Sequence, residues 1–153
     1  MKKKSAGILL YRFANGGLEV FLAHPGGPFW KNKDLEAWSI PKGEFEDNEE
    51  PLTAALREFE EETGKKLSAK NSFELTPVKQ KSGKLIFAWA IEADIDPDKI
   101  VSNSFEVEWP PKSGKMQSFP EIDKAGWFSI TEAKKKINPA QYALIEELGG
   151  KVK

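Results

Sequence analysis

The first part of the chain contains two apolar runs separated by a turn signal. Residues 5–13 and 18–24 are rich in aliphatic and aromatic side chains, and Asn15-Gly16 lies between them. Asn-Gly is a strong hairpin signal because both residues tolerate the positive φ that a tight two-residue turn requires. The pattern therefore predicts an antiparallel β-hairpin over residues 5–24.

Further apolar segments are separated by glycine, proline and polar residues. A loop at residues 25–36 is expected to lead to a short apolar piece at 38–40. Strands are expected at residues 73–78, 85–95, 105–109 and 127–130. Helices are expected at residues 50–63, 131–137 and 139–148. This order of strands, helix, strands and helices predicts a mixed α/β domain in which helices cover a sheet.

The predicted helices carry signals at their ends. Asp47 or Asn48 can cap the first helix, and Gly64 ends it. Thr131 can cap the second helix. Pro139 fits the first turn of the third helix, where the missing N–H of proline would be unpaired in any case. These signals set the expected boundaries of the helices.

The helix expected at residues 50–63 has an apolar stripe and an acidic stripe. The apolar stripe should pack on the sheet, and it consists of Leu52, Ala55, Leu56 and Phe59. Glu58, Glu61 and Glu62 stand at i, i+3 and i+4 and converge on a neighbouring stripe, whereas Glu60 projects away from them. The helix therefore has one face for packing and another for chemistry.

Three converging glutamates need an explanation. Like charges at this spacing destabilise a helix by roughly 0.2–0.5 kcal/mol per pair unless cations neutralise them. Magnesium takes oxygen ligands and binds substrate phosphates at the same time, so a divalent metal would account for the trio. A solvated acidic helix is the plainer alternative.

The charge of the chain is balanced overall but uneven along the sequence. The net charge is −1, yet residues 43–64 contain nine acidic residues and one basic residue, Arg57. An acidic segment in an otherwise basic chain suits a polyanionic ligand that is held through divalent cations, with lysines attracting the anion.

Composition limits the class of protein further. The chain has 153 residues, of which 39% are apolar and 31% charged, and no cysteine, so any metal must bind to oxygen. Arg12 cuts the first apolar run shorter than the roughly 7–15 residues of a signal-peptide core. No segment approaches the roughly 20 apolar residues of a membrane span. We expect a single domain over residues 1–153, located in the cytoplasm and not bound to a membrane.

Residues 43–64 resemble the signature of a known family. The segment reads Gly43-x5-Glu49-x7-Arg57-Glu58-Phe59-x-Glu61-Glu62-x-Gly64. It is similar to the Nudix box G-x5-E-x7-R-E-U-x-E-E-x-G-U, in which U is a bulky apolar residue. All seven fixed residues agree, and Phe59 is an aromatic variant of the first U. Lys65 departs from the second U, and Leu67 is expected to supply that apolar contact. The chain thus resembles the Nudix hydrolase family, also called MutT-like.

The resemblance implies a fold, a reaction and a cofactor. The fold would be an α/β/α sandwich with a mixed β-sheet and a loop-helix-loop catalytic motif. The reaction would be Mg²⁺-dependent hydrolysis of a pyrophosphate linkage in a nucleoside diphosphate linked to another moiety, with Mn²⁺ able to substitute. Residues 38–43 are similar to those of diadenosine polyphosphate hydrolases. A dinucleoside polyphosphate is therefore the favoured substrate, with a nucleoside triphosphate as the close second.

The resemblance also assigns roles by position. The metal ligands would be Glu58, Glu61, Glu62 and the backbone carbonyl of Gly43. The same three glutamates and Arg57 would form the catalytic group, and a glutamate of the trio or of a nearby loop would accept the proton of the attacking water. Arg57 would orient box glutamates, including Glu49, through a forked ion pair. A surface ion pair is the plainer interpretation of Arg57 and Glu49.

Residues outside the box are expected to complete the site. Family members often recruit a further acidic metal ligand, and Glu106 and Glu108 point to one face of the strand at 105–109. We favour Glu108, although a solvated strand face would explain both residues equally well. Lys42 is a candidate for a phosphate contact, and Trp109 or Phe29-Trp30 for stacking on a base, with surface exposure and ordinary packing as the alternatives.

Two other classes of protein share parts of this pattern. A binding module that senses a nucleotide without cleaving it has no need of the intact metal trio. A nucleic-acid-binding protein would need a concentrated basic patch or a binding motif, and the sequence shows neither. We expect a nucleotide or polyphosphate as the small-molecule partner, no stable nucleic-acid partner, and a monomer or homodimer.

Overall fold

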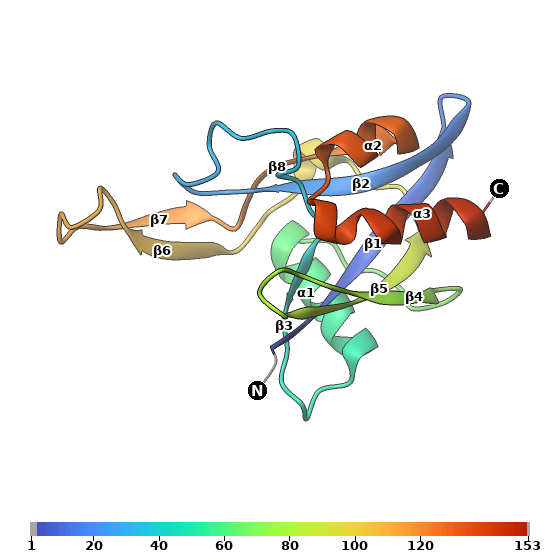
Figure 1. Cartoon of the computed structure of the whole chain (residues 1–153), viewed down its shortest axis with the longest axis horizontal. Coiled ribbons are helices and arrows are strands. Elements are labelled where there is room, and N and C mark those ends of the chain that lie inside the picture. The colour runs from blue at the N-terminus through green and yellow to red at the C-terminus, as the bar shows by residue number, and fades with distance from the viewer. Residues whose placement is uncertain (1–2, 153) are drawn as a thin grey trace.

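The computed structural model describes residues 3–152, whose strands form one mixed sheet and a separate hairpin. The sheet contains β1 (Lys4–Ala14), β2 (Gly17–Pro25), β3 (Lys42–Glu44), β4 (Phe73–Lys79), β5 (Leu85–Glu92) and β8 (Ile122–Ser129). Its order is β4-β5-β1-β2-β8, and β3 pairs with β1. Only β1 and β5 pair in parallel among these strands. The strands β6 (Ser104–Glu108) and β7 (Met116–Pro120) form the hairpin, which projects from the rest of the molecule (Figure 1).

Helices cover both faces of the sheet. They are α1 (Pro51–Thr63), α2 (Ile130–Lys136) and α3 (Tyr142–Lys151), with 3-10 turns at Pro97–Lys99 and Pro139–Gln141. α1 packs on β1 and β5, while α2 and α3 pack on the opposite face. This is the predicted α/β/α sandwich (Figure 1). None of the helices within residues 3–152 combines the length and the apolar character that crossing a membrane would need.

The central strand β1 is buried from both sides. Ile8 and Leu10 belong to the apolar cluster beneath α1, which also contains Phe59. Leu9 belongs to the cluster beneath α2 and α3. Successive strand residues point to opposite faces, so a strand covered on both sides needs a continuous apolar run rather than alternation. The fully buried run of residues 8–10 meets this requirement.

The strand predictions are largely confirmed. β1 and β2 pair in antiparallel fashion around Asn15 and Gly16, whose φ angles are 53° and 84°. β5 ends at Glu92, three residues earlier than expected, and β8 begins at Ile122 instead of residue 127. β3 and β7 were not predicted. The sequence gives little apolar signal for either, because β3 has three residues and only Phe119 of β7 is partly buried.

Two predictions about helix caps are wrong. Neither Asp47 nor Asn48 caps α1, because Glu50 occupies the N-cap position without a side-chain hydrogen bond. Asp47 instead forms an ion pair of 2.7 Å with Lys4. In α2 the cap is Ser129, not Thr131. Ser129 is an equally good capping residue that lies nearer the end of β8, so the length of the strand decides between the two.

Two further helix predictions are wrong in part. The segment at residues 139–148 is not one helix, because Asn138 caps a short 3-10 turn before α3 begins. The buried residues of α1 are Ala54, Ala55, Phe59 and Thr63, so the packed face is rotated away from Leu52. The two alanines allow a closer approach to the sheet than leucine would, and Leu52 and Leu56 are only partly buried.

Candidate active site

Arg57 contacts three glutamates at once. Its Nε and Nη2 atoms each lie 2.8 Å from an oxygen of Glu49, which makes the pair forked. Its Nη1 atom donates to Glu58 at 2.9 Å and to Glu61 at 2.8 Å. The hydrogen bonds with Glu49 hold the pKa of Arg57 above its ordinary value and that of Glu49 below its own. The structure thus brings Arg57 and Glu49 together as expected and adds direct contacts to two members of the trio.

Glu62 is the carboxyl whose acidity the fold alters most. Burial, reinforced by the charge of Glu58, raises the pKa of Glu62 to about 8. Burial also raises the pKa of Glu58, although its hydrogen bond to Arg57 opposes the effect. Burial lowers the pKa of the neighbouring Lys42. The protein therefore stabilises the charged form of Glu62 least among the three glutamates of the trio, since Arg57 contacts the other two but not Glu62.

Gly43 lies directly against Glu58. A β-carbon built on Gly43 would stand 2.0 Å from a carboxylate oxygen of Glu58, far inside van der Waals contact. Pairing with Ala6 of β1 holds Gly43 in β3, so the strand cannot simply move aside. Only glycine allows the backbone to approach the carboxylate this closely.

The trio lines a cavity beside β3, here called the acidic cavity. Its volume is about 500 Å³, and its walls include Gly43, Ser5, Lys42, Lys84 and Glu121 besides the three glutamates. Within residues 3–152, no three acidic or histidine side chains already stand close enough together to hold a metal ion. Arg57 engages two of the three glutamates. The structure brings the candidate ligands to one cavity, with part of their binding capacity used by Arg57.

A second cavity, here called the side cavity, adjoins the first. Its volume is about 240 Å³, and it shares Lys42, Glu62 and Glu121 with the acidic cavity. Gln141 lies in its wall with 1% of its surface exposed. The Gln141 side chain accepts a hydrogen bond from the Ile40 N–H at 3.0 Å, which fixes the amide in place. The residues shared by the two cavities are therefore one basic residue, Lys42, and two acidic ones, Glu62 and Glu121.

The carboxylate from outside the box that joins the trio is Glu121. The Asn103 N–H donates to the Glu61 carbonyl at 3.0 Å, and the Glu121 N–H donates to the Asn103 carbonyl at 2.7 Å. These bonds satisfy a carbonyl in the last turn of α1, which has no partner within the helix, and they bring the junction of β7 and β8 against it. Burial is the main cause of the raised pKa values of Glu58 and Glu62, and the negative charge of Glu121 raises both pKa values further.

The structure does not bring Glu108 to the trio. Its carboxylate accepts hydrogen bonds from the N–H groups of Lys112, at 3.3 Å, and Gly114, at 3.0 Å, within the turn of the β6–β7 hairpin. Glu106 is likewise exposed on β6. The predicted alternation is present, but this face of the hairpin is open to solvent.

Glu121 was missed because residues 116–120 read as a loop. Ser104 pairs with Pro120, so the hairpin places the residue after β7 beside the residue before β6. Pairing residues 104–108 with residues 116–120 around the turn Lys112-Ser-Gly-Lys115 would have placed Glu121 near Asn103 from the sequence alone.

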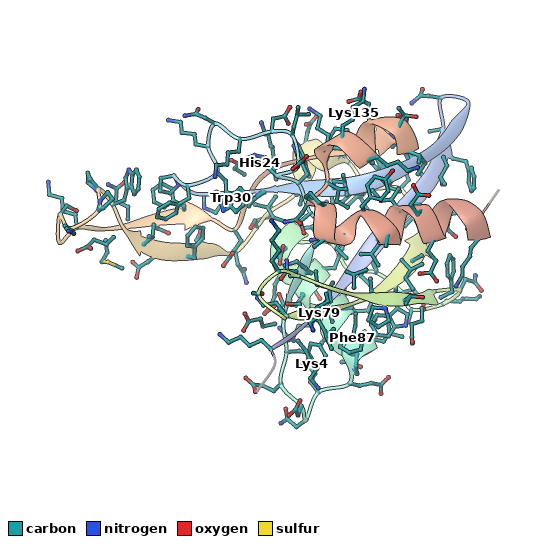
Figure 2. The ribbon with its side chains drawn as sticks, viewed as in Figure 1. Lys4, His24, Trp30, Lys79, Phe87 and Lys135 are labelled. Carbon is teal, nitrogen blue, oxygen red and sulfur yellow. The ribbon has the colours of Figure 1, made fainter. Side chains whose placement is uncertain are left out.

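Trp109 stands outside both cavities. Its ring lies edge-on to Phe29, with 5.4 Å between the ring centroids. Trp30 lines the side cavity instead, and the Lys33 ammonium lies 5.1 Å from the centre of its ring. Figure 2 shows His24 and Trp30 at the end of the sheet from which the hairpin projects. Trp30 is therefore better placed than Trp109 to stack on a base.

The departure at Lys65 does not disturb the exit of α1. Gly64 has a φ of 77°, and its N–H donates to the Glu60 carbonyl at 2.7 Å, which confirms the predicted helix end. Leu67 is partly buried against the cluster beneath α1, as expected.

Known proteins share this fold. The sequence model of the NUDIX domain family matches residues 1–148. The chain therefore belongs to the NUDIX family.

Solved structures of low sequence identity have the same fold. The Ap4A hydrolase of C. elegans, solved as a binary complex, has a TM-score of 0.62 and 20% identity, with 97% of this chain and 96% of that chain covered. The NUDIX domain of Shewanella oneidensis NrtR, complexed with ADP ribose, has a TM-score of 0.65 and 15% identity, with 100% and 90% covered. At these identities the likeness establishes the fold alone.

A curated relative matches over a shorter stretch. The mRNA-decapping protein g5R of African swine fever virus is 47% identical over 45 residues. The match covers 29% of this chain and 17% of that protein, so the chain corresponds to a small part of its relative.

Proposed function

We propose that the protein hydrolyses a dinucleoside polyphosphate or a nucleoside triphosphate with Mg²⁺ at the acidic cavity. The observation that carries this proposal is that carboxylates and lysines line the same cavity. These residues are Glu44, Glu58, Glu61, Glu62 and Glu121, with Lys42 and Lys84. Carboxylates bind hard divalent cations, and ammonium groups bind phosphate oxygens. A cavity with both kinds of group suits a metal-bound polyphosphate.

The donor set fits a hard divalent cation. All candidate ligands are oxygen atoms, from the trio, Glu121 and the Gly43 carbonyl, which is the preference of Mg²⁺ and Mn²⁺. Burial raises the pKa of Glu62 to about 8, which is the behaviour of a carboxylate whose charge a cation would stabilise. When bound, the metal supplies neutralisation of phosphate charge and a more acidic water.

The protein's own groups position the reactants. Arg57 holds Glu58 and Glu61 in place through Nη1. Lys42 lines both cavities and contacts a phosphate oxygen of the bound substrate. The nucleoside occupies the side cavity, where its base stacks on Trp30. A glutamate of the trio, or Glu121, accepts the proton of the attacking water.

A substrate screen tests this proposal. Dinucleoside polyphosphates, nucleoside triphosphates, nucleotide sugars and capped RNA would each be incubated with the protein and Mg²⁺, and the products separated by chromatography. We expect turnover that requires Mg²⁺ and favours the first two classes. A variant with both Glu61→Gln and Glu62→Gln should lose turnover, while Glu60→Gln, on an exposed position of the same helix, should retain it.

Two outcomes count against the proposal. Undiminished turnover by the double variant would remove the trio from the chemistry. Tight nucleotide binding without any product, with either Mg²⁺ or Mn²⁺ present, would instead indicate a nucleotide sensor that keeps the fold.

A further inference from the structure

Ser5 is a buried polar residue without a protein partner. The residue is 1% exposed, and its hydroxyl makes no hydrogen bond to any atom of residues 3–152. Burying a hydroxyl without a partner is unfavourable, and such groups are rare in folded proteins. Ser5 is one of the residues that line the acidic cavity. The unpaired group is therefore an observation that points to a ligand.

The strand register determines what surrounds Ser5. Ser5 of β1 pairs with Glu44 of β3 on one side and with Ile86 of β5 on the other. Directly paired residues on neighbouring strands point to the same face of the sheet, and every second residue of a strand does so too. Ser5, Glu44 and Lys42 therefore share one face, while Gly43 points to the face on which α1 lies.

Lys84 adds a positive charge to the same part of the cavity. It immediately precedes β5, and its ammonium lies 2.8 Å from a carboxylate oxygen of Glu44. This ion pair joins the two strands that flank β1 at Ser5. The side chain of Lys84 is 24% exposed, and it lines the acidic cavity together with Ser5 and Lys42. A hydroxyl and two ammonium groups thus line the part of the cavity formed by strands, while α1 supplies the glutamates.

We propose that Ser5 and Lys84 form a subsite for the phosphate of the substrate that lies farthest from the nucleoside in the side cavity. This inference rests on the proposed function. The serine hydroxyl donates a hydrogen bond to a phosphate oxygen, and the Lys84 ammonium donates a charge-assisted one. Lys42, which lines both cavities, lies along the path between nucleoside and subsite.

The position of the subsite selects the substrate by the length of its phosphate chain. The side cavity and the acidic cavity share Lys42, Glu62 and Glu121 at their junction, and these residues would face the phosphates next to the nucleoside. Ser5 and Lys84 lie beyond this junction in the acidic cavity alone. A longer phosphate chain extends farther past the junction than the two phosphates of a nucleotide sugar, so we expect it to be the one that reaches these groups. The subsite therefore favours polyphosphates.

Direct binding of inorganic triphosphate tests the subsite without relying on turnover. Titration calorimetry on the full chain with Mg²⁺ would compare the wild type with Ser5→Ala, Lys84→Met and the matched control Lys81→Met. Lys81 is exposed in the same turn as Lys84 and does not line the acidic cavity. We expect Kd to rise about tenfold in Lys84→Met and severalfold in Ser5→Ala, as loss of a charge-assisted and a neutral hydrogen bond would give. Lys81→Met should bind as the wild type does.

A stability measurement separates a ligand contact from a structural role. Ser5→Ala removes an unpaired hydroxyl, so the Tm of the ligand-free protein should not fall, while the rise in Tm caused by triphosphate should shrink. In kinetics, the ratio of kcat/KM for a nucleoside triphosphate to that for a nucleotide sugar should fall in both variants. A lowered ligand-free Tm of Ser5→Ala together with unchanged triphosphate affinity would show that Ser5 is structural and overturn the proposal.

The experiment distinguishes this inference from the proposed function. If the wild type binds triphosphate through Ser5 and Lys84 but cleaves no nucleotide, the subsite stands and the proposed function fails. If the wild type cleaves polyphosphates and both variants bind and cleave as it does, the proposed function stands and the subsite is wrong.

Discussion

Arg57 and Glu49 are joined by two parallel hydrogen bonds of 2.8 Å each, from Nε and Nη2 to the two carboxylate oxygens. Glu49 precedes α1 and Arg57 lies within it, so the fork fixes the guanidinium relative to the helix. The third nitrogen, Nη1, is then aimed at Glu58 and Glu61. A side chain with one charged nitrogen cannot make this set of contacts, because only guanidinium has the planar fork.

Arg57→Lys should therefore lower kcat by about 10- to 100-fold, as loss of a group that orients metal ligands typically does. Steady-state kinetics with saturating Mg²⁺ would measure the loss. Arg12→Lys is the matched control, since Nε and Nη2 of Arg12 lie 2.9 Å and 2.8 Å from one carboxylate oxygen of Glu19, away from both cavities. An equal loss of kcat in the two variants would mean that the effect comes from general stability.

Gly43→Ala should displace Glu58, because the added carbon would stand 2.0 Å from its carboxylate. We expect the Mg²⁺ concentration for half-maximal activity to rise about tenfold or more. Gly17→Ala provides the comparison, since no heavy atom lies within 4 Å of the position that its β-carbon would occupy. Its free energy of unfolding should stay within about 0.5 kcal/mol of the wild type. Normal metal dependence in Gly43→Ala would argue against a ligand role for Glu58.

The stability of the metal-free protein should fall as pH rises toward 8. In the folded state the pKa of Glu62 is about 8, against an ordinary value of 4.5. Folding therefore favours the protonated form of Glu62. The stability that this adds is fully present below the ordinary pKa of 4.5 and is lost as the pH rises through the folded-state pKa of about 8. The slope attributable to one group is at most about 1.4 kcal/mol per pH unit.

Denaturant unfolding in EDTA between pH 5 and pH 8 would show this effect, and Glu62→Gln should flatten it because the amide does not titrate. Mg²⁺ should flatten it as well, because a bound cation favours the carboxylate. Identical pH profiles for wild type and Glu62→Gln in EDTA would contradict the prediction.

Glu121→Gln should weaken Mg²⁺ binding about tenfold, because it removes a carboxylate that lines the acidic cavity with the trio. Glu106→Gln, at an exposed position on β6, should have no effect on binding. Calorimetric titration with Mg²⁺ alone would make the comparison without a substrate. A larger loss of affinity in Glu106→Gln than in Glu121→Gln would restore the hairpin glutamates as the candidates.

The fold could be predicted where the local pattern is strong. The turn at Asn15-Gly16 and the helix end at Gly64 each depend on backbone angles that few residues adopt, so the sequence reveals them directly. β3 and β7 could not be found in this way. Their residues have little apolar character, and they become strands only because β1 and β6 lie beside them.

The residues of the candidate site likewise differ in how far the sequence alone predicts their positions. Glu58, Glu61 and Glu62 share one helix, so helical spacing alone brings them together. Glu121 and Ser5 reach the cavity through strand pairing, which depends on partners far away in the sequence. Its charge and its place on the strand made Glu108 our preferred metal ligand outside the box. The spacing of residues within one strand, however, does not determine where that strand lies in the fold. The cytoplasmic location and the oligomeric state stay predictions.

Residues of the acidic cavity come from β1, β3, α1, the β4–β5 turn, the residue before β6 and the β7–β8 junction. These residues extend from Ser5 to Glu121 along the sequence, so no short segment of the chain contains the whole set, and the cavity exists only when these distant elements have come together. A ligand that occupies it binds the native state and not the unfolded chain, and it stabilises the native state by RT ln(1 + [L]/Kd). Because the ligand-binding energy stabilises the folded protein, the Tm or the resistance to protease should rise with the fraction of protein that has ligand bound. A compound could then be ranked as a ligand before its chemistry is known.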